Sequence, residues 1–467
     1  MCFRGILEVQ LMEEEKENIQ FELTDELLEQ VEALVETQQD KDLQNLLNDF
    51  HYADIAEILD ELNLEEAVYV IKLLDSETTS DILMELDEDI REKILKKLSA
   101  KEIAEEVEEL DTDDAADIIL ELPEERQEEV ISKIEDEEHK AEIEELLTYN
   151  EGTAGGLMAK ELVKVYETWT VAGCMRRIRG QAKDVTRVHS IYVVDKEDKL
   201  IGRLSLKDLI TAKSEEKIAE ISNSNVDFVN VYDDVEDVAK VMQKYDLEAI
   251  PVVDNKQTLL GRITIDDIVD VIREEADKDY QLAAGISQDV EADDSILELT
   301  KARLPWLVLG LFGGLGSVFI MKDYQHIMST VPSLFFYTPL IAAMAGNVGV
   351  QSSAIIVQGL ANDNVKGSLL NRLLKEVGLS LINGFALALL VILFGFIIGQ
   401  DTTESFAIAI SMMSVIVVAA LVGTFVPIIL DKRGIDPAIA TGPFITTSND
   451  ILGIYLFFVL ASLIIGF

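Results

Sequence analysis

The strongest constraint on how this chain folds is an abrupt change in its sequence near residue 300. Residues 1–300 hold 31 basic and 80 acidic side chains, whereas residues 301–467 hold 8 of each. The first part therefore carries the whole net charge of -49. The second part consists of apolar stretches of about 20 residues, the length at which an α-helix crosses a bilayer. We therefore expect a multidomain protein with a large acidic soluble part and a helical membrane part.

The membrane part is predicted to contain five spans. The apolar stretches that define them are 303–321, 333–360, 377–399, 405–430 and 437–466. Seven basic residues flank the spans on one side, namely Lys301, Arg303, Lys366, Arg372, Lys375, Lys432 and Arg433, and the other side has only Lys322. Because basic loops remain cytoplasmic, we expect a multi-pass protein of the inner or plasma membrane. Its acidic N-terminal domains should be cytoplasmic and its C-terminus should face outside.

Charge and cysteine content exclude several classes of function. A net charge of -49 repels phosphate backbones and anionic lipid headgroups, so we expect no nucleic-acid partner and no peripheral lipid binding. Only Cys2 and Cys174 occur, which supports neither a disulfide framework nor a cysteine metal cluster. No nucleophile–base pair or metal-binding histidine motif is visible, so we also expect no enzyme.

Residues 21–150 have the pattern of an all-α, acidic helical-repeat domain, preceded by a flexible N-terminus over 1–20. Three similar segments recur, each followed by an acidic stretch and another helix: 57–62, 81–86 and 117–122. On a helix expected to begin near Thr112, Asp113 and Asp117 share a face. Like charges there repel unless a cation or a partner lies between them. The alternative for these and the other carboxylates is a solvated helix face.

Residues 151–275 contain a direct internal repeat with α/β character. Residues 189–210 align without gaps to residues 248–269, and 8 of the 22 positions are identical. Each copy reads as strand, turn, strand and helix, with Gly202 or Gly261 in the second strand. This pair resembles a tandem of CBS domains, a module that senses ligands.

A hydroxyl residue and an aspartate open the helix of each copy, Ser205 with Asp208 and Thr264 with Asp267. In CBS domains these positions can hold the ribose and phosphate of adenine nucleotides, so the resemblance implies ATP as a possible ligand. The alternative is that both pairs only cap helices. The sequence leaves both interpretations open. Residues 276–302 then read as a connecting helix that carries a cytosolic signal to the membrane.

Asp450 is the one acidic residue inside a predicted span rather than at its edge. Counted from Pro437 it lies 13 residues along the span, which at ~1.5 Å per residue is about 20 Å, near the bilayer centre. A charge buried there costs about 2.5–3.5 kcal/mol. The basic residues of this part all lie at the interfaces, so a bound cation is the simplest compensation. The alternative is a protonated or hydrogen-bonded structural aspartate.

Polar and small residues near Asp450 predict a hydrated path. Pro339, Gly346 and Gly349 are expected to loosen the second span and to expose backbone carbonyls, which membranes tolerate only beside protein or water. The predicted pore-lining residues are Asn347, Gln351, Thr446 and Thr447. The alternative for the two amides is hydrogen bonding between helices.

The spans contain no His or Cys, which disfavours soft metals and favours hard cations bound by oxygen. Mg²⁺ keeps several of its waters and needs few carboxylates. A single Asp450 is too little charge for a divalent ion, but a twofold dimer brings two to one axis. This predicts a homodimer with a shared axial pore for Mg²⁺.

The order of these parts resembles the MgtE family of magnesium channels over almost the whole chain. The motifs that match in order are Ala-Gly-Gly-Leu-Met at 154–158, Gly-Asn-Val-Gly-Val-Gln at 346–351, and Asp-Pro-Ala at 436–438 followed by Gly442, Pro443 and Asp450. Ala345 and Val350 depart from the family motif, in which Gly and Asn are frequent. The resemblance implies that Asp450 holds a hydrated Mg²⁺ in a pore at the dimer interface.

The resemblance also implies that cytosolic Mg²⁺ closes the pore by binding among the helical domain, the CBS pair and the connecting, or plug, helix. The matching sensor positions are Asp113, Asp117, Asp234, Glu236, Asp246, Asp267, Asp270, Glu275 and Asp279. The charge agrees with this expectation, because a part of net charge -49 repels itself and compacts when divalent cations bridge its carboxylates. For each position the alternative is a solvated carboxylate.

These observations favour a Mg²⁺-selective channel that imports Mg²⁺ down the membrane potential and is closed by Mg²⁺. The alternative is a proton-coupled divalent-cation carrier with Asp450 as the protonated group and nucleotide at the CBS pair. A further alternative is a membrane-anchored nucleotide sensor without transport. Flux without a proton gradient separates the first two, and an Asp450→Asn variant tests the third.

Overall fold

The computed structural model describes residues 21, 23–182, 185, 187–287, 290, 294–362, 365 and 367–467. The chain forms two compact units that divide between Ile272 and Arg273. The predicted flexible segment 1–20, which includes Cys2, and the basic residue Lys366 lie outside the described residues.

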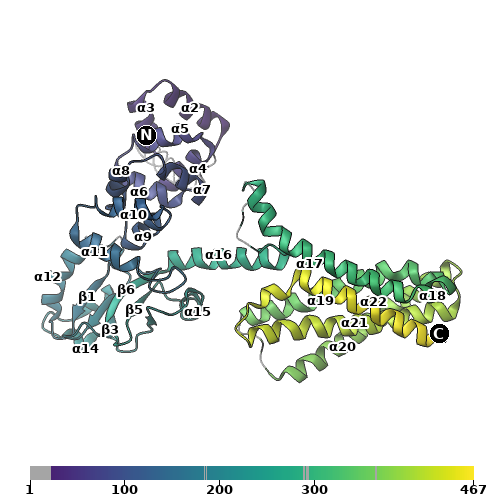
Figure 1. Ribbon diagram of the computed structural model, residues 1–467. Helices are drawn as coiled ribbons and strands as arrows, with labels where there is room; N and C mark the ends of the chain where they lie inside the picture. The colour runs from purple at the N-terminus through teal and green to yellow at the C-terminus, as the bar shows by residue number, and fades with distance from the viewer. Residues whose placement is uncertain are drawn as a thin grey trace, which may run out of the picture. The chain divides into compact units, whose positions relative to one another are not determined.

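The first unit begins with short α-helices, as the acidic repeat predicted (Figure 1). They are α2 (Asp25–Glu36), α3 (Asp40–Leu47), α4 (Tyr52–Glu61), α5 (Leu64–Ile71), α6 (Ser76–Glu85), α7 (Glu88–Leu95), α8 (Ala100–Val107), α9 (Thr112–Leu120), α10 (Glu124–Ile131) and α11 (Glu137–Leu146). The three recurrent segments form the ends of α4, α6 and α9, where paired apolar side chains such as Ile82 and Leu83 are fully buried. Side-chain caps separate successive helices, as at Asn63 and Ser99. The all-α prediction for this part is confirmed.

The internal repeat forms two small sheets of the same design. The elements in chain order are β1 (Val163–Tyr166), α12 (Val171–Gln181), β2 (Ile191–Val194), β3 (Leu200–Leu204), α13 (Leu206–Thr211), α14 (Ile218–Ile221), β4 (Val229–Asn230), α15 (Val235–Tyr245), β5 (Ala249–Val253), β6 (Leu259–Thr264) and α16 (Ile265–Ala284). The strand orders are β1-β2-β3 and β4-β5-β6, and in each sheet the first pair is parallel and the second antiparallel. Both antiparallel pairs shift register at the matching position, Val193/Val194 and Val252/Val253. The α/β tandem predicted from the repeat is therefore confirmed.

The stretch predicted as one connecting helix, 276–302, contains parts of two helices. α16 begins at Ile265 in the first unit, crosses the boundary after Ile272 and continues without interruption to Ala284. α17 (Ile296–Asp323) begins seven residues before the predicted first span, with Ser295 and Glu298 forming its capping box. The polar beginning of α17 is hence continuous with its apolar part.

The second unit contains five helices long and apolar enough to cross a membrane, which confirms the predicted count for the described residues. They are α17, α19 (Pro332–Ala361), α20 (Leu369–Ile397), α21 (Thr402–Asp431) and α22 (Gly442–Ile465), the last preceded by the 3₁₀ turn η2 (Pro437–Ala440). A short helix that the sequence did not predict, α18 (Gln325–Thr330), joins α17 to α19. α19, α21 and α22 supply the buried core, for example Ile341, Ile416 and Phe457.

Candidate functional site

An open cavity of about 350 Å³ lies between α19 and α22. Its lining consists of Ala342, Ala343, Gly346, Asn347, Val350, Gln351, Thr446 and Asp450. Asp450 is partly buried, whereas the Asn347 and Gln351 side chains are exposed. Four of the five predicted pore residues are thus brought together around one space.

Helical spacing explains this convergence. Thr446 and Asp450 are four residues apart on α22, and Asn347 and Gln351 are four apart on α19, so each pair shares one face. The Thr446 hydroxyl donates a hydrogen bond of 2.8 Å to the Gly442 carbonyl, one turn back in α22. Its hydroxyl oxygen keeps acceptor capacity toward the cavity.

The fifth predicted pore residue, Thr447, does not line the cavity. Its side chain lies against α17, where a Cβ on Gly313 would overlap the Thr447 methyl group. The two threonines are neighbours in sequence and therefore diverge by about 100° around the helix.

The glycines of α19 bring two helices together, so the expectation that they loosen the span is wrong. At Pro339 it holds, because proline has no N–H and the Phe335 carbonyl accepts instead from the Thr338 hydroxyl at 2.7 Å. α19 is a continuous α-helix that includes Pro339. A Cβ on Gly349 would overlap the Asn449 amide, and one on Gly346 would lie 3.1 Å from the Thr446 methyl group. The small residues thus permit close helix contact, as is typical of membrane packing.

The segment that leads to Asp450 is not one uniform helix, although the candidate span extends from Pro437 to Ile465 as predicted. Pro437 starts the 3₁₀ turn η2 and not the long helix, because Gly442 adopts a φ of +47° that interrupts the helical path. α22 begins at Gly442, so Asp450 lies eight residues, or about 12 Å, from the start of its helix. The end of α16 meets this start, since a Cβ on Gly442 would overlap the Ala283 carbonyl.

Sequence reasoning missed Asn449 and the roles of the two unusual motif positions. Asn449 is 1% exposed, and neither polar atom of its amide has a hydrogen-bond partner among the described residues. Ala345 is buried against α22, where a Cβ on Gly453 would lie 2.9 Å from the Ala345 Cβ. Val350, in contrast, lines the cavity. The adjacent polar run 446–450 was the available signal for Asn449.

The cavity offers one carboxylate, two side-chain amides and a hydroxyl. All of these present oxygen atoms, the ligands that hard cations such as Mg²⁺ prefer. Of the described histidines, His326 lies in α18 and none lies in a long helix of this unit. The structure therefore agrees with the expectation of an oxygen-lined path.

A second concentration of acidic groups lies in the first unit, where α9 meets the CBS pair. Asp113 is buried, and burial raises the pKa of its carboxyl well above the usual value, with Asp114 and Asp267 adding to the shift. Burial likewise raises the pKa of Asp111 to about 6 and that of Asp114 to about 7. The Asp111 carboxylate lies 3.7 Å from the guanidinium of Arg262. Two predicted sensor residues, Asp113 and Asp267, are thus neighbours.

Ligand atoms of Asp111, Asp113 and Glu161 lie within 4.8 Å of one another, which is close enough for one cation to contact all three. Glu161 also caps α9, since it accepts hydrogen bonds from the Thr112 backbone N–H at 3.2 Å and hydroxyl at 2.9 Å. Asp117 is not part of this group. The other sensor candidates, Asp234, Glu236, Asp246, Asp270, Glu275 and Asp279, belong to neither three-ligand group found in the described chain.

Several of those candidates have local structural partners. Asp234 caps α15 by accepting a hydrogen bond from the Glu236 N–H at 2.9 Å, and Glu236 lies 3.3 Å from the ammonium of Lys240. Asp246 ends α15 in the left-handed region, at φ 49°. Glu275 lies 2.9 Å from Lys278.

The two hydroxyl–aspartate pairs of the CBS repeat have the hydrogen bonds of helix caps. The Ser205 hydroxyl donates to the Asp208 carboxylate at 2.7 Å and accepts from its backbone N–H at 3.1 Å. The Thr264 hydroxyl donates to the Asp267 carboxylate at 2.6 Å. Capping therefore accounts for the local geometry, and the choice between capping alone and nucleotide binding stays open.

Comparison with known proteins matches all three regions. A family described as "Divalent cation transporter" (MgtE) matches residues 338–460, the "MgtE intracellular N domain" matches 50–152, and the CBS domain matches 154–215 and 218–274. The "Magnesium transporter MgtE" of Enterococcus faecalis is 38% identical over 318 residues, which are 68% of this chain and 70% of that protein. The protein of the same name from Bacillus subtilis is 33% identical over 317 residues, with shares of 68% and 70%.

Solved structures resemble the soluble part. The cytosolic domain of the Mg²⁺ channel MgtE in complex with ATP is 36% identical and covers 52% of this chain and 99% of that one, with a TM-score of 0.48. The soluble part of a magnesium transporter is 31% identical and covers 54% and 99%, with a TM-score of 0.49. On its sequence matches alone, this chain belongs to the MgtE family of divalent cation transporters.

Proposed function

We propose that this membrane protein transports Mg²⁺ as a channel, with Asp450 as the carboxylate that holds the hydrated ion in the cavity between α19 and α22. The observation that carries the proposal is the convergence of Asp450, Asn347, Gln351 and Thr446 on that cavity. Magnesium transport is the activity in the names of the matched relatives. As a transporter, the chain is expected to have no enzymatic activity.

The exposure of the cavity supports a homodimer. Asn347 and Gln351 are exposed, and polar side chains at membrane depth are stable only beside water or protein. A second copy related by a twofold axis would cover this face and supply a second Asp450, which would match the charge of a divalent ion. The pore therefore belongs to the interface between two copies.

Closure by cytosolic Mg²⁺ is the regulatory part of the proposal. The close group Asp111, Asp113, Glu161 and Asp267 concentrates negative charge where the helical domain meets the CBS pair. A divalent cation there relieves the repulsion and fixes the two domains against each other. Nucleotide at the CBS pair remains a further expected ligand, with ATP bound in one relative.

The orientation follows from the basic residues at helix ends. Lys301 and Arg303 lie near the start of α17, Arg372 and Lys375 near the start of α20, and Lys432 and Arg433 after α21. With five spans, these positions share one side of the membrane, which we assign to the cytoplasm. The N-terminal domains are then cytoplasmic and the C-terminus lies outside.

The test is Mg²⁺ uptake into proteoliposomes in which membrane potential and proton gradient are set independently. The channel is supported if membrane potential alone drives uptake and if Asp450→Ala abolishes that uptake. The control, Asp323→Asn at the end of α17, should keep it. Uptake that collapses with the proton gradient would support the proton-coupled carrier instead. Undiminished uptake by Asp450→Ala would place the ion path elsewhere.

A separate experiment tests the dimer. In a background without the native thiols (Cys2→Ser, Cys174→Ala), Val350→Cys at the cavity should cross-link between two copies on mild oxidation. Leu390→Cys, exposed on α20 outside the cavity, is the matched control. Equal cross-linking at both positions, or none at Val350→Cys, would argue against an axial cavity.

A further inference from the structure

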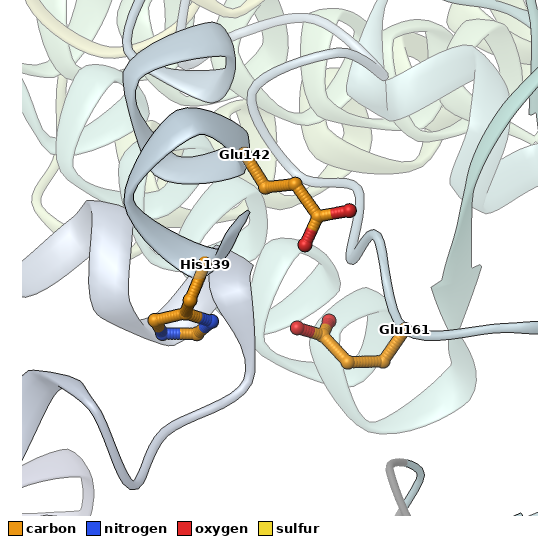
Figure 2. A group of neighbouring side chains, drawn as sticks. All are labelled: His139, Glu142 and Glu161. Carbon is orange, nitrogen blue, oxygen red and sulfur yellow. The ribbon is translucent and has the colours of Figure 1, made fainter. Parts of the chain in front are cut away.

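A histidine and two glutamates meet in the first unit, and one of them, Glu161, also belongs to the group with Asp111 and Asp113. His139 and Glu142 lie on α11, and Glu161 lies in the segment that leads from the helical domain to β1. Ligand atoms of the three side chains lie within 4.8 Å of one another. Figure 2 shows the two carboxylates and one ring nitrogen of His139 directed toward a common space.

The imidazole of His139 is held in an orientation that presents one ring nitrogen to the two carboxylates. Its Nε2 lies 3.2 Å from the backbone carbonyl of Val107, and a carbonyl can only accept a hydrogen bond. Nε2 is therefore the donor, and Nδ1 is the ring nitrogen directed toward Glu142 and Glu161, where the lone pair of the neutral ring would lie (Figure 2). A metal-bound histidine commonly donates its other ring N–H to a backbone carbonyl in this way.

The carboxylates are also positioned by neighbours outside the group. Thr112 donates two hydrogen bonds to Glu161, from its backbone N–H and its hydroxyl. Glu142 follows His139 by three residues and so shares its helix face. The ammonium of Lys160 pairs with Glu145 at 2.7 Å.

The electrostatic surroundings favour an added cation. Burial raises the pKa of the Glu142 carboxyl, and the charge of Glu161 raises it further, while Lys160 acts in the opposite direction. Two partly buried carboxylates that repel each other are stabilised when a divalent ion neutralises both.

We propose that His139, Glu142 and Glu161 form a binding site for a divalent transition-metal cation of the series from Mn²⁺ to Zn²⁺. An imidazole nitrogen with two carboxylates suits these ions, whereas Mg²⁺ demands oxygen ligands and keeps its waters. Ligand bonds of ~2.0–2.2 Å require the three ligand atoms to lie within about 4.4 Å, so small side-chain rotations complete the site.

The proposed site connects the helical domain to the CBS pair. It joins α11 of the helical domain to the segment before β1, and through Thr112 it also reaches the start of α9. A bound transition metal would therefore fix the helical domain against the CBS pair beside the Asp111–Asp113 group, with which the site shares Glu161. The proposal concerns metal binding alone and does not depend on transport.

The experiment is a Co²⁺ titration of the full purified chain in detergent, freed of metal and kept in excess Mg²⁺ to occupy oxygen-only sites. Bound Co²⁺ is measured by elemental analysis after dialysis, and nitrogen ligation by the visible Co²⁺ absorption. The wild type should bind one Co²⁺ per chain that Mg²⁺ does not displace. His139→Gln and Glu142→Gln should each weaken this binding at least about tenfold, since even the loss of an outer partner costs about 10–100-fold.

His51→Asn is the matched control, because His51 lies in the same domain and Asn keeps an acceptor for the Ala53 N–H that it caps. This variant should bind Co²⁺ like the wild type. Circular dichroism checks folding, and if His139→Gln does not fold, Glu142→Gln decides. Failure of the wild type to retain Co²⁺ in Mg²⁺, or wild-type binding by a folded His139→Gln or Glu142→Gln, would overturn the proposal.

Discussion

Gly349 shows how a single hydrogen atom in place of a side chain sets the distance between α19 and α22. A Cβ there would overlap the amide of Asn449 and lie 2.7 Å from Ile445. Gly349→Ala should therefore push the helices apart and destabilise the membrane part by about 1–3 kcal/mol. We expect a lower unfolding midpoint in detergent and reduced Mg²⁺ uptake.

The matched control is Gly378→Ala in α20, where the added Cβ meets nothing within 4 Å. A Gly-to-Ala change at an open helical position should leave the midpoint unchanged or raise it. Equal behaviour of the two variants would contradict the role assigned to Gly349.

The acidic group at α9 should make stability depend on pH. Burial raises the folded-state pKa to about 6 for Asp111 and to about 7 for Asp114, above the ordinary aspartate value of 3.8. Groups with raised values contribute stability that is present below pH ~4 and lost as the pH rises through 6 to 7. Without divalent cations, the free energy of unfolding of the first unit should fall by about 2–4 kcal/mol over this window.

Calorimetry of the full chain between pH 4 and 8 would check this, with and without Mg²⁺. Asp113→Asn should reduce the slope and raise the midpoint at pH 8 in chelator. Mg²⁺ should reduce the slope in the wild type, because it binds the ionised carboxylates. A midpoint that climbs steadily toward pH 8 in chelator would be incompatible with this account.

At the residue scale, the sequence predicted which polar side chains belong to the membrane part better than it predicted which way each of them points. Asp450, Asn347, Gln351 and Thr446 were predicted from the cost of polar groups in a membrane, and they share one cavity. Thr447 is equally polar, but its direction depends on which face of α22 meets α17. That depends on packing between segments far apart in sequence. The His139 group was missed for the same reason, because Glu161 belongs to a different part of the chain.

At the scale of helices, Arg91 of α7 connects three elements. Its guanidinium donates hydrogen bonds to the Leu83 and Met84 carbonyls at the end of α6, each at 3.3 Å, and forms an ion pair with Glu121 after α9. Both side chains are less than 15% exposed. Arg91→Ala should destabilise the helical domain by about 3 kcal/mol, because it leaves the Glu121 carboxylate buried and unpaired.

Thermal unfolding of the full chain measures this effect. Lys93→Ala is the control, since Lys93 forms an exposed pair with Asp89 at 3.9 Å and should change stability by less than about 0.5 kcal/mol. Adding Glu121→Gln to Arg91→Ala should recover part of the loss. A loss no larger than that of Lys93→Ala would show that the ion pair contributes little.

Element identity was predictable where periodicity was strong, as in the helical repeat, the CBS copies and the five spans. Boundaries were harder. The start of α22 depends on the positive φ of Gly442, a residue that also lies close to the Ala283 carbonyl of a segment far away in sequence. The sequence also did not predict that α17 begins before its apolar part. The residues change from polar to apolar within the helix, but the helical backbone continues across that change.

At the scale of the whole molecule, the net charge of -49 predicts a response to ions. Raising KCl from about 0.01 M to 1 M shortens the screening length from about 30 Å to 3 Å and should raise the unfolding midpoint of the acidic part. Mg²⁺ at equal ionic strength should raise it further, because it also binds specific carboxylates. Equal shifts by the two salts would indicate screening alone, which calorimetry at matched ionic strength would reveal.

α16 has a mechanical consequence. Its 20 residues contain neither Pro nor Gly, the usual causes of helix kinks, so it behaves as a stiff rod about 30 Å long. One end is held by the Thr264–Asp267 hydrogen bonds, and at the other end Ala283 lies close to Gly442, where α22 begins. For a rod of this length, a tilt of about 10° at one end displaces the other end by about 5 Å. We therefore expect a small rearrangement of the carboxylates at the Asp267 end of α16 to produce a larger displacement at its Ala283 end.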